Sequence, residues 1–347
     1  MKAAVLEAFH QPLQVRELPI PSPGPNEVLV KVMASGLCLT DTHIQDGIIA
    51  SVRLPYIPGH EMAGIVVQIG PNPKQSTLSP GQHVVCGIDF TCGHCSLCSS
   101  GRPNLCRHRV RIGFERNGSH AEYALVPSEN LFPIAEHIPF DQACIIPDAV
   151  ACMYHAIFTQ GHVTQGSKVL IHGVGALGLQ GVQLAKLQLA KLAGATVYAA
   201  ARTHVKLEQA LRFGADQVIP TREKDLVSTL EEMTQGEMCD VAFDLVGNAD
   251  SLSLLLHCIR PGGKIVALAY AEDAFSVPCQ ELVIKEKEIL GLRGSTPDEL
   301  RASIRLVEEG KILPYVSSHF RLDEINQALD FLREAKGIGR SVLMMDP

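Results

Sequence analysis

Four cysteines fall within one short stretch of the chain and could together hold a metal ion. They follow the pattern Cys-x2-Cys-x2-Cys-x7-Cys, at Cys92, Cys95, Cys98 and Cys106. Four thiolates suit tetrahedral zinc and leave no position for a substrate, so this loop predicts a structural zinc site. Two disulfides, free thiols or an iron–sulfur cluster are the alternatives, although the proline that follows the last cysteine in bacterial cluster sequences is missing. His94 lies inside the loop, and we expect it not to be a ligand.

A glycine-rich turn could bind a dinucleotide. The apolar run 169–172 leads directly into Gly173-Val174-Gly175-Ala176-Leu177-Gly178, and a helical pattern follows. In this context the first glycine permits a tight turn, the second lets the backbone approach a pyrophosphate, and the third lets helix and strand pack closely. The helix N-terminus adds free N–H groups and the positive end of a dipole. We therefore predict a dinucleotide site here; the alternative is a glycine turn without a ligand.

The end of the next predicted strand bears on which dinucleotide is bound. An NAD site usually places Asp or Glu there, about 20 residues after the turn, to hold the ribose 2′-hydroxyl. This strand ends in Ala201, Arg202 and Thr203, without an acid. A carboxylate would repel a 2′-phosphate, whereas an arginine can pair with it through two hydrogen bonds. The sequence thus predicts a preference for NADP, with NAD as the alternative if Arg202 is only a solvated loop charge.

Two further motifs contain residues of metal-binding type. Cys38 lies in Gly36-Leu37-Cys38-Leu39-Thr40-Asp41-Thr42-His43, and His60 lies in Pro58-Gly59-His60-Glu61. Alone, each would more often be an ordinary core residue. With the cysteine loop and the glycine turn, in this order, the chain resembles the zinc-dependent alcohol dehydrogenases of the medium-chain dehydrogenase/reductase superfamily. The resemblance covers nearly the whole chain, as far as Gly339-Arg340-Ser341-Val342.

The resemblance implies a second, catalytic zinc. It makes Cys38 and His60 two of its ligands and Asp148 the third, because residues 145–155 are similar to the branch of the family that uses an aspartate. Cys144 and Cys152, four residues on either side, are the competing candidates. Glu61 is implied to stand behind the metal, which leaves one coordination position open for water or substrate.

The resemblance also implies a proton relay and further cofactor contacts. Thr40 and His43 match the residues that pass the alcohol proton to solvent, and Asp41 matches one that holds the backbone near the zinc. Arg340 matches an arginine that reaches the cofactor pyrophosphate, and Val246 is expected beside the cofactor. For His43 and Arg340 the alternative is an ordinary surface charge.

The implied activity is hydride transfer between an alcohol, secondary or cyclic, and NADP, with two zinc ions per chain. A polyol, sugar or acyl-CoA-linked hydroxyl substrate, with NAD, is an alternative within the superfamily. A dinucleotide-binding protein without catalysis, holding only the structural zinc, is an alternative from another class. Family members are dimers or tetramers, so a homo-oligomer is expected.

The elements that must position these residues change in character near residue 150. Before it, short β-branched runs separated by Gly and Pro, at 28–32, 64–70 and 83–86, predict an antiparallel barrel or sandwich. After it, strands alternate with helices, which predicts a doubly wound parallel sheet. The predicted strands are 168–172, 195–201, 218–219, 240–246 and 264–269; the predicted helices are 176–192, 204–213, 222–234 and 249–259, and then 297–309 and 323–334 in the tail.

The patterns and the resemblance together predict the fold class α/β with two domains. A Rossmann dinucleotide-binding domain spans 150–287, and a GroES-like β-barrel catalytic domain combines 1–149 with 288–347. The active site is expected in the cleft between them. The helix after the glycine turn is predicted to be about one turn longer than usual in the family, through a local duplication at 186–193.

Composition narrows the function further. The 347 residues suggest two domains, and 30 basic against 37 acidic residues, without a basic block, argue against nucleic-acid binding. No apolar stretch approaches the ~18 residues of a membrane span. The first residues do not resemble a signal peptide, so we expect a cytoplasmic protein in which clustered cysteines bind metal rather than form disulfides.

Overall fold

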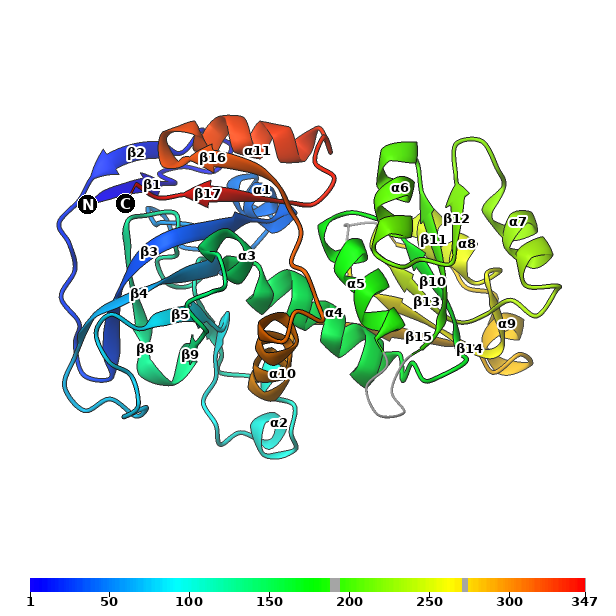
Figure 1. Ribbon diagram of the computed structural model, residues 1–347, viewed down its shortest axis with the longest axis horizontal. Coiled ribbons are helices and arrows are strands. Elements are labelled where there is room, and N and C mark those ends of the chain that lie inside the picture. The colour runs from blue at the N-terminus through cyan, green and yellow to red at the C-terminus, as the bar shows by residue number, and fades with distance from the viewer. Residues whose placement is uncertain (188–193, 270–273, 347) are drawn as a thin grey trace. The chain divides into compact units, whose positions relative to one another are not determined.

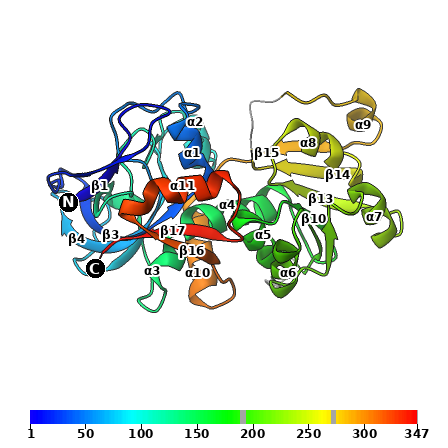
Figure 2. The ribbon, with the colours of Figure 1, turned by 90° about the horizontal axis from the view of Figure 1, so that it is seen from above.

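The computed structural model describes residues 1–187, 194–269 and 274–346, and the chain divides into two compact units (Figures 1 and 2). Unit 1 consists of Met1–Ala151 and Ser295–Pro347, and unit 2 of Cys152–Gly294. The predicted second boundary, at 287/288, falls too early because β15 (Glu288–Gly291) is still a strand of the sheet in unit 2. Among the described residues, no helix is both long and apolar enough to cross a membrane.

Unit 1 is built on a seven-stranded sheet that joins the two ends of the chain. The order is β16-β17-β3-β4-β5-β9, with β8 also paired to β3. All neighbours are antiparallel except β16 and β17. The strands are β3 (Glu27–Leu37), β4 (Glu61–Ile69), β5 (His83–Cys86), β8 (Tyr123–Pro127), β9 (Leu131–Pro133), β16 (Val316–Arg321) and β17 (Arg340–Met344). Because β17 pairs with β3, a segment near the end of the chain completes the sheet that β3 begins.

The core of unit 1 follows from the β-branched runs of its sequence. Val28, Val30 and Val32 point from β3 into one buried cluster with Leu343 of β17. The other strands and α-helices of unit 1 are β1 (Lys2–Val5), β2 (Gln14–Glu17), β6 (Asp89–Phe90), β7 (Val110–Arg111), α1 (Leu39–Gln45), α2 (Ser96–Ser99), α3 (Phe140–Cys144), α10 (Pro297–Glu308) and α11 (Ile325–Arg333), and α4 (Ala151–Tyr154) spans the boundary with unit 2.

Unit 2 contains a six-stranded parallel sheet in the order β12-β11-β10-β13-β14-β15. Its strands are β10 (Lys168–His172), β11 (Thr196–Ala201), β12 (Gln217–Pro220), β13 (Cys239–Asp244), β14 (Ile259–Ala267) and β15. Connecting them are α5 (Ala176–Lys186), α6 (His204–Arg212), α7 (Leu226–Met233), α8 (Ala249–Leu255) and α9 (Cys279–Val283). This is the doubly wound Rossmann order, so the predicted fold class is confirmed for this unit, and its strand order reverses between β10 and β13.

Helix α5 is shorter than the sequence pattern predicted. It ends at Lys186, and Leu187 has an extended ψ of 131°. The carbonyl of Ala185 accepts hydrogen bonds from the N–H groups of Gly194 and Ala195, at 3.4 and 3.2 Å, so the chain returns there toward β11. The rest of the predicted helix, with the duplication at 186–193, lies outside the described residues from 188 onward.

Candidate functional site

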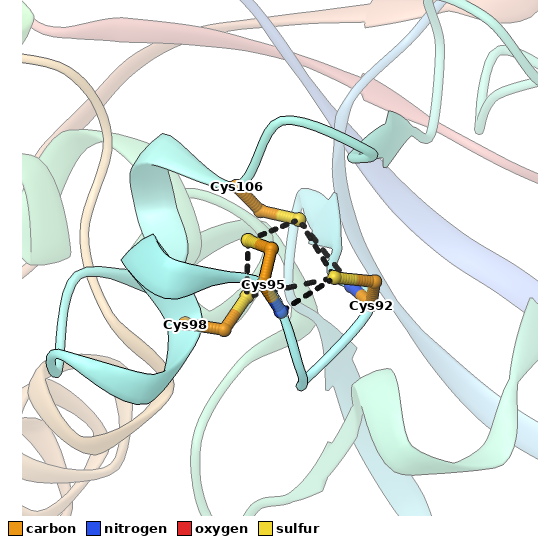
Figure 3. Close-up of side chains that lie close together, drawn as sticks. All are labelled: Cys92, Cys95, Cys98 and Cys106. Carbon is orange, nitrogen blue, oxygen red and sulfur yellow. Dashed lines mark hydrogen bonds between the residues drawn. The ribbon is translucent and has the colours of Figure 1, made fainter.

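The four-cysteine loop of unit 1 gathers its sulfurs around one point (Figure 3). Cys92 follows β6, Cys95 precedes α2, Cys98 lies within α2, and Cys106 follows a short turn of helix at Pro103–Leu105. All four Sγ atoms lie within 4.8 Å of one another. The Sγ atoms of Cys92 and Cys106 are 3.5 Å apart, well beyond the ~2.05 Å of a disulfide. All eleven cysteines of the chain are free, so the structure holds no disulfide here.

Backbone N–H groups point at several of these sulfurs. The N–H of Cys95 donates to Cys92 Sγ and that of His108 to Cys106 Sγ, each at 3.4 Å. Backbone N–H groups of Cys98 and Arg107 hold the pKa of the Cys95 thiol at about 5. His94 directs its Nδ1 to the carbonyl of Cys92, at 2.8 Å, and is not a member of the group. Four sulfurs this close together fit one tetrahedral zinc ion.

A second group of possible metal ligands lies in unit 1. One donor atom each from Cys38, His60, Glu61 and Asp148 falls within 4.8 Å of the others. Cys38 caps the N-terminus of α1, His60 and Glu61 stand at the start of β4, and Asp148 lies in a π-helical segment, Ile146–Val150. Of the competing candidates, Cys144 instead directs its Sγ to the carbonyl of Asp141, at 3.2 Å. Among the described residues, neither Cys144 nor Cys152 joins the group.

Two glycines of the motifs make room for this group. Gly36 pairs with Glu61 across β3 and β4, and a Cβ at Gly36 would lie 2.8 Å from the Cβ of Glu61, closer than real side chains allow. Gly59 has a φ of +100°, which L side chains rarely adopt, and a Cβ there would collide with His120. The motifs Gly-x-Cys and Gly-His-Glu therefore need their glycines for steric reasons, a role that the sequence analysis did not assign.

Buried charges surround the ligands and set their protonation. Asp41 accepts the N–H of Cys38 at 2.8 Å, as expected for a residue that holds the backbone, and its Oδ1 lies 3.4 Å from His60 Nδ1. Burial lowers the pKa of His60, but Asp41 and Cys38 together outweigh this and raise it well above its usual value. Burial raises the pKa of the Cys38 thiol, but Arg340 and His60 together bring it below its usual value.

Arg340 lies in this group rather than on the surface. Its side chain is 5% exposed; Nε donates to Glu61 Oε2 at 3.0 Å, Nη2 donates to Glu61 Oε1, and Nη2 also donates to Asp148 Oδ2 at 2.5 Å. The alternative of a plain surface charge is therefore wrong. A contact with a cofactor pyrophosphate stays a prediction. The sequence pattern did not predict that Arg340 pairs with Asp148 and Glu61, because these partners lie 192 and 279 residues away in the chain.

The predicted relay residues lie on α1, directly after the Cys38 cap. Thr40 Oγ1 is 3.5 Å from Cys38 Sγ, so the hydroxyl stands beside the ligand group. His43 follows three residues later, on the same face of the helix, and is half-buried. The structure thus places a hydroxyl next to the ligands and an imidazole one helical turn away, while the relay itself stays a prediction.

In unit 2 the three glycines of the turn differ in the way that dinucleotide binding requires. Gly173 has a φ of +102°, so only glycine is unstrained there. A Cβ at Gly178 would collide with the carbonyl oxygen of Gly173, so this position allows the helix to approach the strand. A Cβ at Gly175 would meet nothing within 4 Å, so the backbone N–H groups at the start of α5 are open to a ligand. Ala176 and Leu177 form the first residues of α5.

The residues predicted to choose the dinucleotide also lie in unit 2. Ala201 is the buried last residue of β11, Arg202 is exposed, and Thr203 caps α6. Val246 follows β13 and is 46% exposed despite its apolar side chain. Because β10, β11 and β13 are parallel neighbours, their carboxyl ends lie along one edge of the sheet.

Comparison with known proteins identifies the family of the chain. Residues 24–136 match the family described as alcohol dehydrogenase GroES-like domain, and residues 181–309 match zinc-binding dehydrogenase. An alcohol dehydrogenase of Geobacillus stearothermophilus is 32% identical over the full length of both chains. A D-arabinose 1-dehydrogenase (NADP(+)) of Saccharolobus solfataricus is 30% identical over 99% of this chain and 97% of its own. The crystal structure of an NAD-dependent alcohol dehydrogenase superposes with a TM-score of 0.93, at 29% identity and full coverage of both chains.

These matches agree with the geometry of each unit. The GroES-like match covers most of the first segment of unit 1, where both cysteine-containing groups lie, and the second match covers most of the parallel sheet. The predicted fold class, a GroES-like domain with a Rossmann domain, is thereby confirmed for the whole chain. The chain belongs to the zinc-type alcohol dehydrogenases of the medium-chain dehydrogenase/reductase superfamily.

Proposed function

We propose that this oxidoreductase interconverts a secondary or cyclic alcohol and its carbonyl compound, with catalytic zinc and with NADP as the preferred cofactor. The observation that carries the proposal is the convergence of Cys38, His60 and Asp148 beside the Thr40 hydroxyl. One thiolate, one imidazole and one carboxylate make a three-ligand set typical of catalytic rather than structural zinc sites. The four-cysteine loop would hold the second, structural ion.

Each of these residues of unit 1 would have a distinct role in the reaction. Cys38, His60 and Asp148 would hold the zinc, which supplies a Lewis acid that lowers the pKa of an alcohol hydroxyl. Thr40 would accept the proton of that hydroxyl, and His43 would pass it to solvent. Loss of this proton from the oxygen, and transfer of a hydride from the carbon that bears it to the nicotinamide, give the carbonyl product. Glu61 and Arg340 would keep the ligand carboxylate in place from behind.

The preference for NADP rests on two cations at the end of β11. Lys206, in the first turn of α6, is half-buried, and both this burial and the nearby charge of Arg202 lower its pKa. The first turn of α6 contains no acidic residue. Cations are unfavourable at a helix N-terminus, so this arrangement costs stability unless an anion such as a 2′-phosphate binds there. NAD remains the alternative, since one similar protein is named for NADP and another for NAD.

A polyol or sugar substrate is the second candidate. The relative from Saccharolobus, named for D-arabinose, covers nearly the whole chain at 30% identity, so the fold and family do not by themselves choose a simple alcohol. A cytoplasmic location and assembly into dimers or tetramers stay predictions.

Zinc counting and turnover together test the proposal. The purified enzyme is expected to hold two zinc ions per chain and to oxidise secondary or cyclic alcohols with NADP. Asp148→Ala should retain one zinc and lose turnover, while Cys144→Ala, the matched change at a competing position, should retain both zinc ions and activity. One zinc in the wild-type enzyme, or full activity in Asp148→Ala, would contradict the catalytic site. Turnover of only sugars or polyols would favour the second candidate.

A further inference from the structure

A buried carboxylate beside the glycine turn has no part in the function proposed above. Asp244 is the last residue of β13 and is completely buried. Its Oδ1 accepts the N–H groups of Val246, at 3.1 Å, and Gly247, at 3.4 Å, and its Oδ2 accepts the hydroxyl of Ser251 at 2.8 Å. His172, the last residue of β10, places Nδ1 3.4 Å from the same Oδ1. The carboxylate therefore ties the ends of two neighbouring strands to the segment after β13.

That segment forms one wall of the glycine turn. A Cβ at Gly173 would lie 3.2 Å from Leu245 Cβ and 3.3 Å from Val246 Cγ2, and a Cβ at Gly178 would lie 3.3 Å from Leu245 Cδ1. The N–H of Leu245 also donates to the carbonyl of His172, at 2.9 Å. The shape of the turn thus depends on where Leu245 and Val246 are held.

This wall lies at the part of the sheet where ligands usually bind. Doubly wound sheets bind ligands outside the carboxyl ends of their strands, where the strand order reverses, which in unit 2 is between β10 and β13. Val246 stands there half-exposed and apolar, next to the buried Asp244. Burying a carboxylate is costly unless it accepts hydrogen bonds, and Asp244 accepts them from the very segment that lines the turn.

We propose that Asp244 is a positioning residue of the dinucleotide site, which holds Leu245–Gly247 in place as the wall of the glycine turn. The inference rests on the proposed function, since it assumes that a dinucleotide binds at this turn. Asp244 acts through the backbone of Val246 and Gly247. It needs acceptor oxygens in the right place rather than a charge, so asparagine, which keeps Oδ1, should replace it, and alanine should not.

The test is dinucleotide affinity in the full-length, zinc-loaded enzyme. Titration with NADPH and with NADH, followed by nicotinamide fluorescence, should show that Asp244→Ala raises the Kd of the preferred dinucleotide about tenfold or more. Asp244→Asn should stay within about threefold of wild type. In turnover, the KM for the cofactor should rise in Asp244→Ala while kcat stays nearly unchanged. An asparagine variant as impaired as the alanine variant would overturn the positioning role.

The opposite end of the same strand offers a matched control. Asp240 of β13 accepts the N–H of Lys168 at 2.6 Å and Nε of Arg260 at 2.7 Å, so Asp240→Ala also removes a carboxylate that links β13 to β10. It should leave the Kd unchanged. If Asp244→Ala does not fold, Ser251→Ala tests the proposal instead. It removes the donor to Oδ2 of Asp244 and should raise the Kd of the dinucleotide about threefold.

The outcomes separate the two proposals. Wild-type enzyme that binds neither dinucleotide would overturn the proposed function. Wild-type enzyme that binds one of them, with an unchanged Kd in Ser251→Ala and in folded Asp244→Ala, would overturn only the role of Asp244.

Discussion

At the scale of single residues, the buried pair of Arg340 and Glu61 should matter far more than a similar pair at the surface. Glu61 is 0% exposed, so replacing Arg340 with methionine leaves a carboxylate buried without its cation. Such unpaired charges lower the free energy of unfolding by about 3–5 kcal/mol. Arg333 makes a similar two-bonded pair with Asp46, but both side chains are about a third exposed, so Arg333→Met should cost about 0–1 kcal/mol. Urea denaturation of both variants measures the difference, and equal losses would contradict it.

A second prediction at this scale concerns the pH dependence of stability. Burial holds the pKa of His120 at about 4, against a usual value near 6.5. Below pH 6.5 the unfolded chain therefore binds a proton that the folded chain does not, so stability falls as the pH drops toward 4. Between pH 6.5 and 5.5 this group should cost about 1 kcal/mol. Denaturation at several pH values, with zinc in excess, should show a shallower slope in His120→Gln; an identical slope would contradict the role of His120.

At the scale of elements, substitutions of two glycines in the turn before α5 should affect stability and dinucleotide binding differently. A Cβ at Gly178 collides with the backbone of Gly173, so Gly178→Ala should push α5 away from β10 and lower stability as well as dinucleotide affinity. A Cβ at Gly175 meets no protein atom, so Gly175→Ala should keep the stability of wild type. It should nevertheless weaken dinucleotide binding about tenfold or more, because it fills the space of the pyrophosphate. Thermal melts and fluorescence titrations distinguish the two; an unchanged affinity in Gly175→Ala would argue against a dinucleotide at this turn.

The secondary-structure elements also show how much of the fold could be predicted from the sequence. The order from β10 to β14 and their connecting helices followed from alternating apolar patterns, whereas α9 and β15 were not predicted, and α7 begins at Leu226 rather than at 222. The reason is local, because Asp225 caps the helix by accepting the N–H of Ser228 at 2.9 Å. The pairing of Arg340 with Glu61 and the contact of Asp244 with Val246 were not predictable in this way. The first depends on the pairing of β17 with β3, and the second on a turn that no periodicity describes.

At the scale of the whole molecule, the two units should lose their ligands independently. Unit 1 is completed by β17, where Val342 is 0% exposed and pairs with Gly36, two residues before Cys38. Val342→Asp should therefore disrupt unit 1 and release zinc, while dinucleotide binding survives, because every residue of the glycine turn belongs to unit 2. Val266 of β14 is equally buried in unit 2, so Val266→Asp should abolish dinucleotide binding and leave both zinc ions in place. A buried, unpaired carboxylate is costly enough to unfold a marginally stable unit in either case. Zinc content and fluorescence titration of the two variants test this directly, and loss of both ligands in both variants would show that the units fold as one.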